Sequence, residues 1–281
     1  MHFFIGTSGY DYPEWKGVFY PQNLKRAEFL SYYATQFNAL ELNFSFYGMP
    51  TADKMSSFYD RTEGKLVFSV KANQLLTHKI GVNWKDDAET FIAAINPLYK
   101  RNVLGAVLFQ FPESFHYTNE NRLYLAKLIQ VFDGFPVVIE FRHREWVRDS
   151  VFVGLEKMRA SLCFCDMPRL KNLPDGTLLG APFVGDVAYI RLHGRNADAW
   201  YAVNSVDSGS SDSGKNGSER YNYDYSADEL TKFVPVINEA MNKGKKVHVY
   251  FNNHPCGNGA KNATLLKEMM QWSNLQMLAI Q

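Results

Sequence analysis

The stretch VHVYFNNHPCGNGAKNA, residues 247–263, changes character halfway along its length. Its first five residues are mostly β-branched or aromatic and fit a buried strand. Asparagine, histidine, proline and glycine follow, and a helical pattern begins near Lys261. The same succession of a short apolar strand and a helical segment recurs along the chain. This alternation predicts an α/β fold.

Eight short apolar runs are predicted strands. They span residues 3–6, 39–43, 66–71, 105–110, 137–142, 161–166, 187–193 and 246–252. Helical spacing lies between them, as after the capping box of Ser226 and Glu229. The sequence has neither a GxGxxG motif after the first strand nor a Walker-type GxxxxGK[ST] motif, which disfavours a doubly wound nucleotide-binding sheet. We therefore expect a TIM-barrel-like parallel (β/α) barrel, with residues 1–281 as a single domain.

Bulk composition disfavours several classes of protein. The 281 residues carry a net charge of +1, which argues against a broad basic surface for duplex nucleic acid, so nucleic acid is not a favoured partner. No apolar run approaches the roughly 20 residues that span a bilayer, and we expect no membrane partner. The N-terminus lacks the basic and apolar regions of a signal peptide.

Three cysteines favour a reducing compartment, and we expect a cytoplasmic protein. Cys163 and Cys165 lie two apart on one predicted strand. They therefore share a face and are poorly placed to bridge each other. Cys256 stands alone.

One segment, residues 194–225, contains no clear element and follows the seventh predicted strand. Its centre, VNSVDSGSSDSGKNGSE, is rich in serine and glycine, and aromatic residues flank it. A loop this long within a compact domain is usually functional or disordered. It is predicted to be a lid, and an inserted surface loop without a role is the alternative.

Polar residues near the carboxyl ends of seven strands keep one parity within each strand. They are Glu41, Asn43, Ser69, Lys71, Asn73, Gln110, Glu140, Arg142, Asp166, Arg191, His193, His248, Tyr250 and Asn252. The opposite parity is mostly apolar and includes Cys163 and Cys165. Because alternate side chains face opposite ways, the polar set is predicted to point into the barrel at its C-terminal mouth, where barrel enzymes carry out their chemistry. An ion-pair network that only fills the barrel is the alternative.

Seven blocks of sequence occur in a fixed order: GTSGYDYPEWKGVFYP, LELNFSFYGMPT, FSVKANQLLTH, GAVLFQFPESF, VVIEFRHREW, AYIRLHGR and VYFNNHPCGNGAKNA. Together they resemble the YecE-like family, catalogued as domain of unknown function 72, almost from end to end. The resemblance implies a TIM-barrel-like fold and supplies no activity. The family motif falls here on Glu41, Asn43, Lys71, Gln110, Glu140, Arg142, Asp166, Arg191, His193, Asn252 and Asn253.

Carboxylates and cations alternate within the polar set, which predicts a site for an anion. The planar guanidinium groups of Arg142 and Arg191 suit phosphate or carboxylate. The N-terminus of the last helix, approached through Gly257 and Gly259, would offer backbone N–H groups at the same mouth. A metal site would have fewer cations beside it, so we predict no metal and no cofactor and keep a divalent metal as an alternative.

Roles follow from residue type. The catalytic candidates are Glu41, Glu140, Asp166, His193 and Lys71. The two glutamates are candidates for an acid–base pair and His193 for a proton carrier, whereas an ion pair is favoured over a Schiff base for Lys71. The substrate-binding candidates are Asn43, Gln110, Arg142, Arg191, Arg195, Tyr250, Asn252, Asn253 and Trp200.

These residues predict an enzyme, a hydrolase or lyase, for a small substrate bearing phosphate or carboxylate. Two alternatives stay open. One is a metal-dependent phosphodiesterase resembling DNA-repair endonucleases, in which rim aromatics stack on bases. The other is a ligand-binding protein without catalysis.

Overall fold

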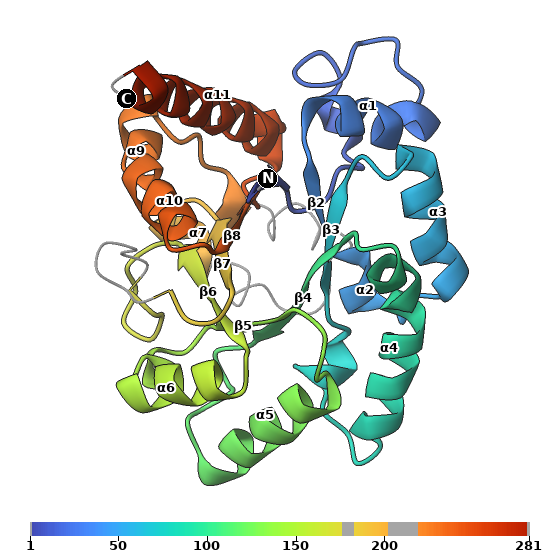
Figure 1. The fold of residues 1–281 in the computed structure, drawn as a ribbon, viewed down its shortest axis with the longest axis vertical. Coiled ribbons are helices and arrows are strands. Elements are labelled where there is room, and N and C mark those ends of the chain that lie inside the picture. The colour runs from blue at the N-terminus through green and yellow to red at the C-terminus, as the bar shows by residue number, and fades with distance from the viewer. Residues whose placement is uncertain (1, 176–182, 202–218, 280–281) are drawn as a thin grey trace.

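In the computed structural model, which describes residues 2–175, 183–201 and 219–279, parallel strands alternate with helices around a barrel (Figure 1). The described strands are β1 Phe3–Thr7, β2 Ala39–Leu42, β3 Val67–Lys71, β4 Leu104–Phe111, β5 Val137–Phe141, β6 Ser161–Asp166, β7 Val187–Leu192 and β8 Lys246–Phe251. Every predicted strand is present, and its ends fall within one residue of the predicted ones. The TIM-barrel-like fold is thus confirmed.

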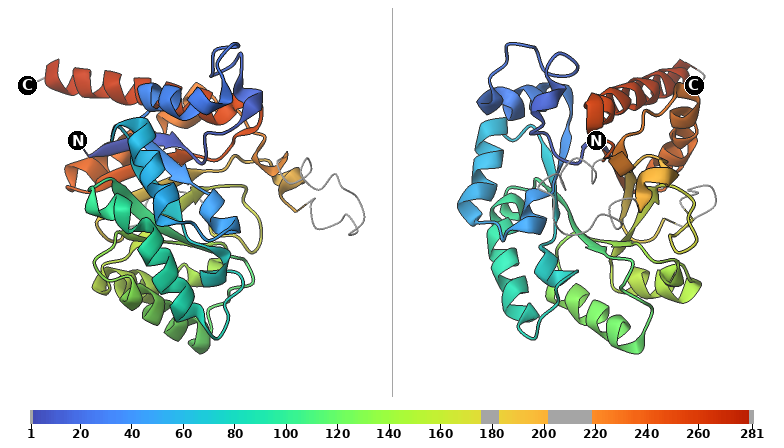
Figure 2. Two further views of the ribbon diagram at one scale, coloured as in Figure 1. Left: turned by 90° about the vertical axis from the view of Figure 1, so that its right-hand side faces the viewer. Right: turned by 180° about the vertical axis from the view of Figure 1, so that it is seen from behind.

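Helices surround the strands on the outside of the barrel (Figures 1 and 2). The described α-helices are α1 Phe29–Gln36, α2 Phe44–Tyr47, α3 Ala52–Thr62, α4 Trp84–Lys100, α5 Asn119–Val131, α6 Asp149–Lys157, α7 Ala197–Trp200, α9 Ala227–Thr231, α10 Phe233–Asn242 and α11 Asn258–Ala279. The short α2 and α7 are exceptions and lie at the carboxyl end of the barrel, where Phe46 contacts Lys71 and Trp200 contacts Arg142. Ser226 and Glu229 form the predicted capping box at α9. The helix expected there is divided into α9 and α10, because Pro235 has no N–H to donate to the carbonyl of Thr231. Within the described residues, no helix combines the length and the apolar character needed to cross a bilayer.

The barrel closes between β1 and β2 without a regular ladder. The sheet order is β1-β8-β7-β6-β5-β4-β3-β2, and an isolated bridge from Ser8 to Glu41 joins its two edges. Asn38 fills part of the remaining gap with its side chain. Its Oδ1 accepts from the Ile5 N–H at 2.8 Å and its Nδ2 donates to the Phe3 carbonyl at 2.9 Å. Side-chain amide groups thus replace missing ladder bonds.

Tyr33 extends this seam between β1 and β2. Its hydroxyl accepts from the Thr7 N–H at 2.7 Å and donates to the Ala39 carbonyl at 3.0 Å. The two strands approach closely here, because a Cβ atom on Gly6 would lie only 2.0 Å from the Ala39 carbonyl oxygen. Glycine is therefore required at this position by close backbone contact.

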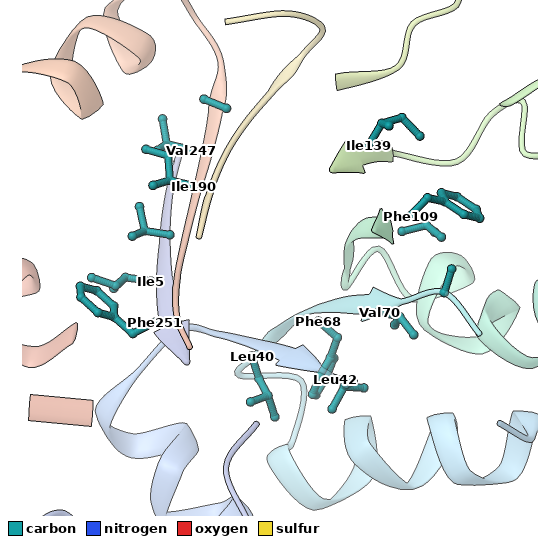
Figure 3. Close-up of a cluster of buried hydrophobic side chains, with 14 of the residues drawn as sticks. Ile5, Leu40, Leu42, Phe68, Val70, Phe109, Ile139, Ile190, Val247 and Phe251 are labelled. Atoms are coloured by element: carbon teal, nitrogen blue, oxygen red, sulfur yellow. The ribbon is translucent and has the colours of Figure 1, made fainter. Parts of the chain in front are cut away.

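Apolar side chains of the outward parity form the main core between the strands and the helices (Figure 3). Those drawn include Ile5, Leu40, Leu42, Phe68, Val70, Phe109, Ile139, Ile190, Val247 and Phe251. A second, smaller cluster fills the barrel interior and includes Val138, Tyr189 and Tyr250. The strand parity predicted from the sequence is confirmed for these outward residues.

The sixth strand has the opposite parity from the predicted one. Cys163 and Cys165 belong to the interior cluster, and Leu162 and Phe164 pack into the outer core. The larger side chains fill the space toward the helices, as Phe164 does against Phe183 with ring centres 5.3 Å apart. Both cysteines are free, as predicted, although their sulfur atoms lie 3.8 Å apart.

Candidate active site at the carboxyl end of the barrel

Arg191 on β7 links two buried carboxylates across the barrel. Its Nη2 donates to Glu41 Oε1 on β2 and its Nη1 to Glu140 Oε2 on β5, each at 2.7 Å. None of these side chains is more than 2% exposed. Burial alone would lower the pKa of Arg191, but the two carboxylates hold that pKa well above its ordinary value. Arg191 is therefore a permanently charged centre of the cluster.

Further donors complete the surroundings of Glu41. Ser8 Oγ donates to Oε1 at 2.7 Å, and the Tyr189 hydroxyl donates to Oε2 at 2.8 Å. Both carboxylate oxygens thus accept from donors inside the barrel. Tyr189 was not among the predicted site residues. It has the same strand parity as Arg191, and this parity is the sequence signal that could have identified it.

Glu140 is held in a similar way on the opposite side. The Arg142 Nε donates to its Oε1, and the Cys163 thiol lies 3.7 Å from its Oε2. Burial favours a raised pKa for Glu140, but the charges of Arg142 and Arg191 bring the pKa well below its ordinary value. Glu140 is consequently ionised at neutral pH and is a poor proton donor.

His193 connects Arg142 to the end of β8. Its Nε2 lies 3.1 Å from Arg142 Nη2, and its Nδ1 lies 2.9 Å from the side-chain amide of Asn252. Burial and then the charges of Arg142 and Arg191 lower the pKa of His193 well below its ordinary value, so the ring is neutral. Because arginine can only donate, Nε2 of the neutral ring is the acceptor of this contact. Both ring nitrogens are engaged, so His193 orients the Arg142 guanidinium.

Lys71 on β3 has neutral and aromatic neighbours. Its Nζ donates to Gln110 Oε1 at 2.9 Å and lies 4.1 Å from the centre of the Phe46 ring. No carboxylate of the described residues lies within ion-pair distance of the amine. Burial, followed by the positive charge of Arg191, lowers the pKa of Lys71 to about 7. The ion pair expected for Lys71 is therefore contradicted. Phe46 was also not among the predicted site residues, because an aromatic residue that follows a strand is only a weak sign of a functional site.

Asp166 and Arg195 form a separate pair at the rim. Arg195 Nη2 donates to Asp166 Oδ1 at 2.8 Å, and Tyr225 donates its hydroxyl to Oδ2 at 2.6 Å. Arg195 also contacts Glu229 at 3.0 Å. The predicted inward direction of Asp166 is wrong because Cys163 and Cys165 take that parity. Asp166 thus does not join the cluster around Arg191.

Tyr250 and Asn253 lie among structural contacts. Tyr250 is fully buried, with its hydroxyl 2.9 Å from Ser69 Oγ, and it has no surface left for a substrate. Asn253 is also fully buried and donates to the Tyr223 carbonyl and to Asn262 Oδ1. The structure therefore places Tyr250 in the barrel core and Asn253 in the connection to α11.

Three other predicted binding residues lie beside the cluster. Gln110 and Asn252 touch Lys71 and His193 as described, and the Trp200 ring centre lies 5.8 Å from the Arg142 Cζ. Asn43 follows β2 and precedes α2 as its N-terminal flanking residue. Of the predicted lid, residues 202–218 lie outside the described residues.

Two groups of side chains within the described residues have the geometry to hold a metal ion. One is Glu140, Cys163 and Cys165, which is fully buried. The other lies after β4 and β5, where His116 Nδ1 and His143 Nδ1 are 3.3 and 3.6 Å from Glu145 Oε2. Two imidazoles and a carboxylate are ligands that suit zinc. In the first group, guanidinium groups already engage both oxygens of Glu140.

Comparison with known proteins supports one family. The family model described as "Protein of unknown function DUF72" matches residues 4–280. The UPF0759 protein YunF of Bacillus subtilis (strain 168) is 31% identical over 261 residues, which cover 89% of each chain.

Solved structures agree with this match. The DUF72 family protein TM1631 of Thermotoga maritima MSB8 superimposes with a TM-score of 0.83 at 33% identity, covering 96% of this chain and 100% of that one. A DUF72 family protein (ef0366) of Enterococcus faecalis V583 gives a TM-score of 0.78 at 21% identity, with 96% and 95% coverage. The second likeness supports the fold alone.

Proposed function

We propose that the chain, which belongs to the DUF72 family, is an enzyme, a hydrolase or lyase, that acts on a small molecule carrying a phosphate or carboxylate group. The observation that carries this proposal is the charge balance inside the barrel mouth. Two carboxylates, Glu41 and Glu140, pair with two guanidinium groups, Arg191 and Arg142. Lys71 has no such partner among the described residues. A protonated Lys71 is thus a surplus positive charge that an anion would neutralise.

Arg142 is the group best placed to meet that anion. Its side chain is 12% exposed, whereas those of Arg191 and Glu140 are almost completely covered. Nε and Nη2 of Arg142 are engaged by Glu140 and His193, and Nη1 makes no hydrogen bond within the described part of the chain. A guanidinium held from two sides loses little freedom when it binds an anion.

We propose a different task for Glu41 and Glu140 from the predicted acid–base pair. Both are fully buried, and their oxygens accept from residues of the barrel itself. We therefore propose that they hold the two arginines in place. We propose Lys71 for proton transfer or nucleophilic attack, since burial and the charge of Arg191 lower the pKa of its amine to about 7 and no carboxylate pairs with it among the described residues.

Anion binding tests the proposal directly. Inorganic phosphate and oxalate would be titrated by isothermal calorimetry into the wild type, the Arg142→Met variant and the Arg122→Met variant as a matched control. Arg122 is an exposed arginine that also lies on an aromatic ring, that of Tyr117. We expect Arg142→Met to weaken binding by about tenfold or more, because a charged hydrogen bond is lost. Equal affinity in all three proteins, or no binding to any, would refute the anion site.

A second candidate is the metal-dependent phosphodiesterase, favoured specifically by the group of His116, His143 and Glu145. A divalent ion there would supply a Lewis acid for phosphodiester cleavage. Calorimetric titration with Zn²⁺ and Mn²⁺, followed by cleavage assays on single- and double-stranded DNA, decides this alternative. Metal binding and cleavage that disappear together in His143→Ala would support it over the anion enzyme. Tight binding of an organic anion without turnover would instead favour a binding protein.

A further inference from the structure

Lys71 is surrounded by groups that direct its amine without protonating it. Gln110 Nε2 donates to the Phe111 carbonyl at 3.0 Å, which turns Oε1 of the same amide toward Lys71 Nζ at 2.9 Å. A glutamate at position 110 would hold the ammonium form, whereas the neutral glutamine accepts one N–H and leaves the charge state open. The Phe46 ring covers another side of the amine at 4.1 Å.

We infer that the amine of Lys71 forms an imine with the carbonyl carbon of a small 2-oxo acid. The inference rests on the proposed function, because Arg142 would hold the carboxylate of that acid. Gln110 on β4 pairs in register with Glu140 on β5 and touches Lys71 on β3. Glu140 in turn accepts a hydrogen bond from Arg142 Nε. A short chain of contacts thus links the amine to the guanidinium across three neighbouring strands.

The chemistry balances with a proton from solvent as the only further reactant. The lone pair of Nζ attacks the carbonyl carbon, and the carbonyl oxygen takes up a proton to give a carbinolamine. The hydroxyl group then leaves as water with one of the two protons on nitrogen, which forms the carbon–nitrogen double bond of a protonated imine. The iminium withdraws electrons from the neighbouring carbon, which eases cleavage of a bond there and corresponds to the lyase branch of the proposal.

The surroundings of Lys71 favour the unprotonated amine, which is the nucleophilic form of lysine. Burial and the nearby arginines lower the pKa of Lys71 to about 7, so that about half of the amine is unprotonated at neutral pH. An ordinary lysine, with a pKa near 10.4, is unprotonated in roughly one molecule in a few thousand under the same conditions. Lys71 should therefore react far faster than the exposed lysines.

Reductive trapping tests this inference. The full-length protein is incubated at pH 7 with pyruvate or glyoxylate and sodium borohydride, and the modified lysine is located by peptide mass spectrometry. The variants are Lys71→Met and Lys71→Arg, with Lys54→Met as the matched control, because Lys54 is an exposed lysine over aromatic rings. We expect one adduct at Lys71 in the wild type and in the control, formed about a hundredfold faster than at exposed lysines, and none at position 71 in the other two variants.

The outcomes separate this inference from the proposal on which it rests. If oxalate binds the wild type and Arg142→Met weakens that binding, but Lys71 stays unmodified, the imine is refuted and the anion site stands. Adducts spread evenly over exposed lysines also refute it. If neither binding nor trapping occurs, both ideas fail. Lys71→Arg keeps a positive charge at the site, so loss of trapping in a folded Lys71→Arg protein is not a folding defect.

Discussion

Arg191 and Lys71 are two cations at the same end of one barrel, and their surroundings differ in kind. Arg191 lies between Glu41 and Glu140 at 2.7 Å from each. Lys71 contacts an amide oxygen and a phenyl ring. Burial acts against the charge of both groups, but carboxylates reverse its effect for the arginine alone.

This difference means that the charge of Arg191 stabilises the structure, whereas the amine of Lys71 is free to interact with a ligand. A buried ion such as Arg191, whose two terminal nitrogens each meet a carboxylate, is held in place and contributes to a unique arrangement of its neighbours. A buried amine without a counter-ion is poised between two protonation states, and an incoming ligand can select one of them. The paired side of the barrel thus holds the site together, and the unpaired side is where we expect chemistry.

The largest effect is expected from removing the paired cation. Arg191→Met leaves Glu41 and Glu140 buried without their shared partner, and the free energy of unfolding should fall by about 3–5 kcal/mol. Urea denaturation at pH 7 measures this loss. A change near zero would mean that the two carboxylates are not held by Arg191, and the contrast with Lys71 would disappear.

Removing the unpaired cation, Lys71, should increase the free energy of unfolding. Lys71→Met eliminates an amine whose protonated form is costly to bury, and the variant should be more stable than the wild type at pH 6, by about 2–4 kcal/mol. Between pH 7 and about 10.4 the unfolded lysine binds a proton that the folded one has released. Wild-type stability therefore rises with pH relative to the variant, and the advantage of the variant vanishes near pH 10.

Chemical denaturation of both proteins at pH 6, 8 and 10 checks this pattern. The difference between the two curves removes the contribution of every other titrating group. A difference independent of pH would show that Lys71 has an ordinary pKa in the folded state. It would also remove the main support for nucleophilic chemistry at this residue.

A smaller effect is expected from one donor on the paired side. Tyr189→Phe removes the hydroxyl that donates to Glu41 Oε2 at 2.8 Å, and the free energy of unfolding should fall by about 1–2 kcal/mol. Tyr99→Phe is the matched control, because the exposed Tyr99 hydroxyl donates to the Gly134 carbonyl at 3.0 Å. Equal losses in the two variants would mean that burial adds nothing to the Glu41 contact.

The smallest effect is expected from an ion pair outside the barrel. Arg26 donates to both carboxylate oxygens of Asp11, but the two side chains are 66% and 44% exposed. Solvent screens such a pair, so Arg26→Met should leave the denaturation midpoint within experimental error. A loss comparable with that of Arg191→Met would show that pairing matters in this protein irrespective of burial.

The fold was predictable because the strands are short and differ sharply from their flanks. Parallel barrel strands are apolar on the outer face, and the alternation in Leu40, Leu42, Phe68 and Val70 fixes that face without tertiary information. The sixth strand was not predictable in this way. Its Cys163 and Cys165 are small and apolar enough for either face of the strand. In the structure they face the barrel interior, and the neighbouring Phe164 packs against Phe183 on the outer face.

The sequence predicted which residues lie in the candidate site better than it predicted which of them contact one another. Parity brought Glu41, Glu140 and Arg191 to the same end of the barrel, because in-register parallel strands align their carboxyl ends. Strand parity could not predict which side chains form hydrogen bonds or ion pairs, because those contacts depend on how far each side chain extends across the barrel interior. For that reason the sequence favoured an ion pair for Lys71 where the structure places Gln110. The catalytic and binding roles themselves stay predictions.

The seam between β1 and β2 has a consequence for how the protein is made. β1 pairs with β8, with Phe3 opposite Val247, so the ladder of β1 can form only after the segment that contains Val247 has left the ribosome. The bonds of β1 to Asn38 and Tyr33, in contrast, join residues that are close in the sequence. Since Arg191 on β7 bonds both Glu41 and Glu140, the reactive centre can form only after β7 has been synthesised.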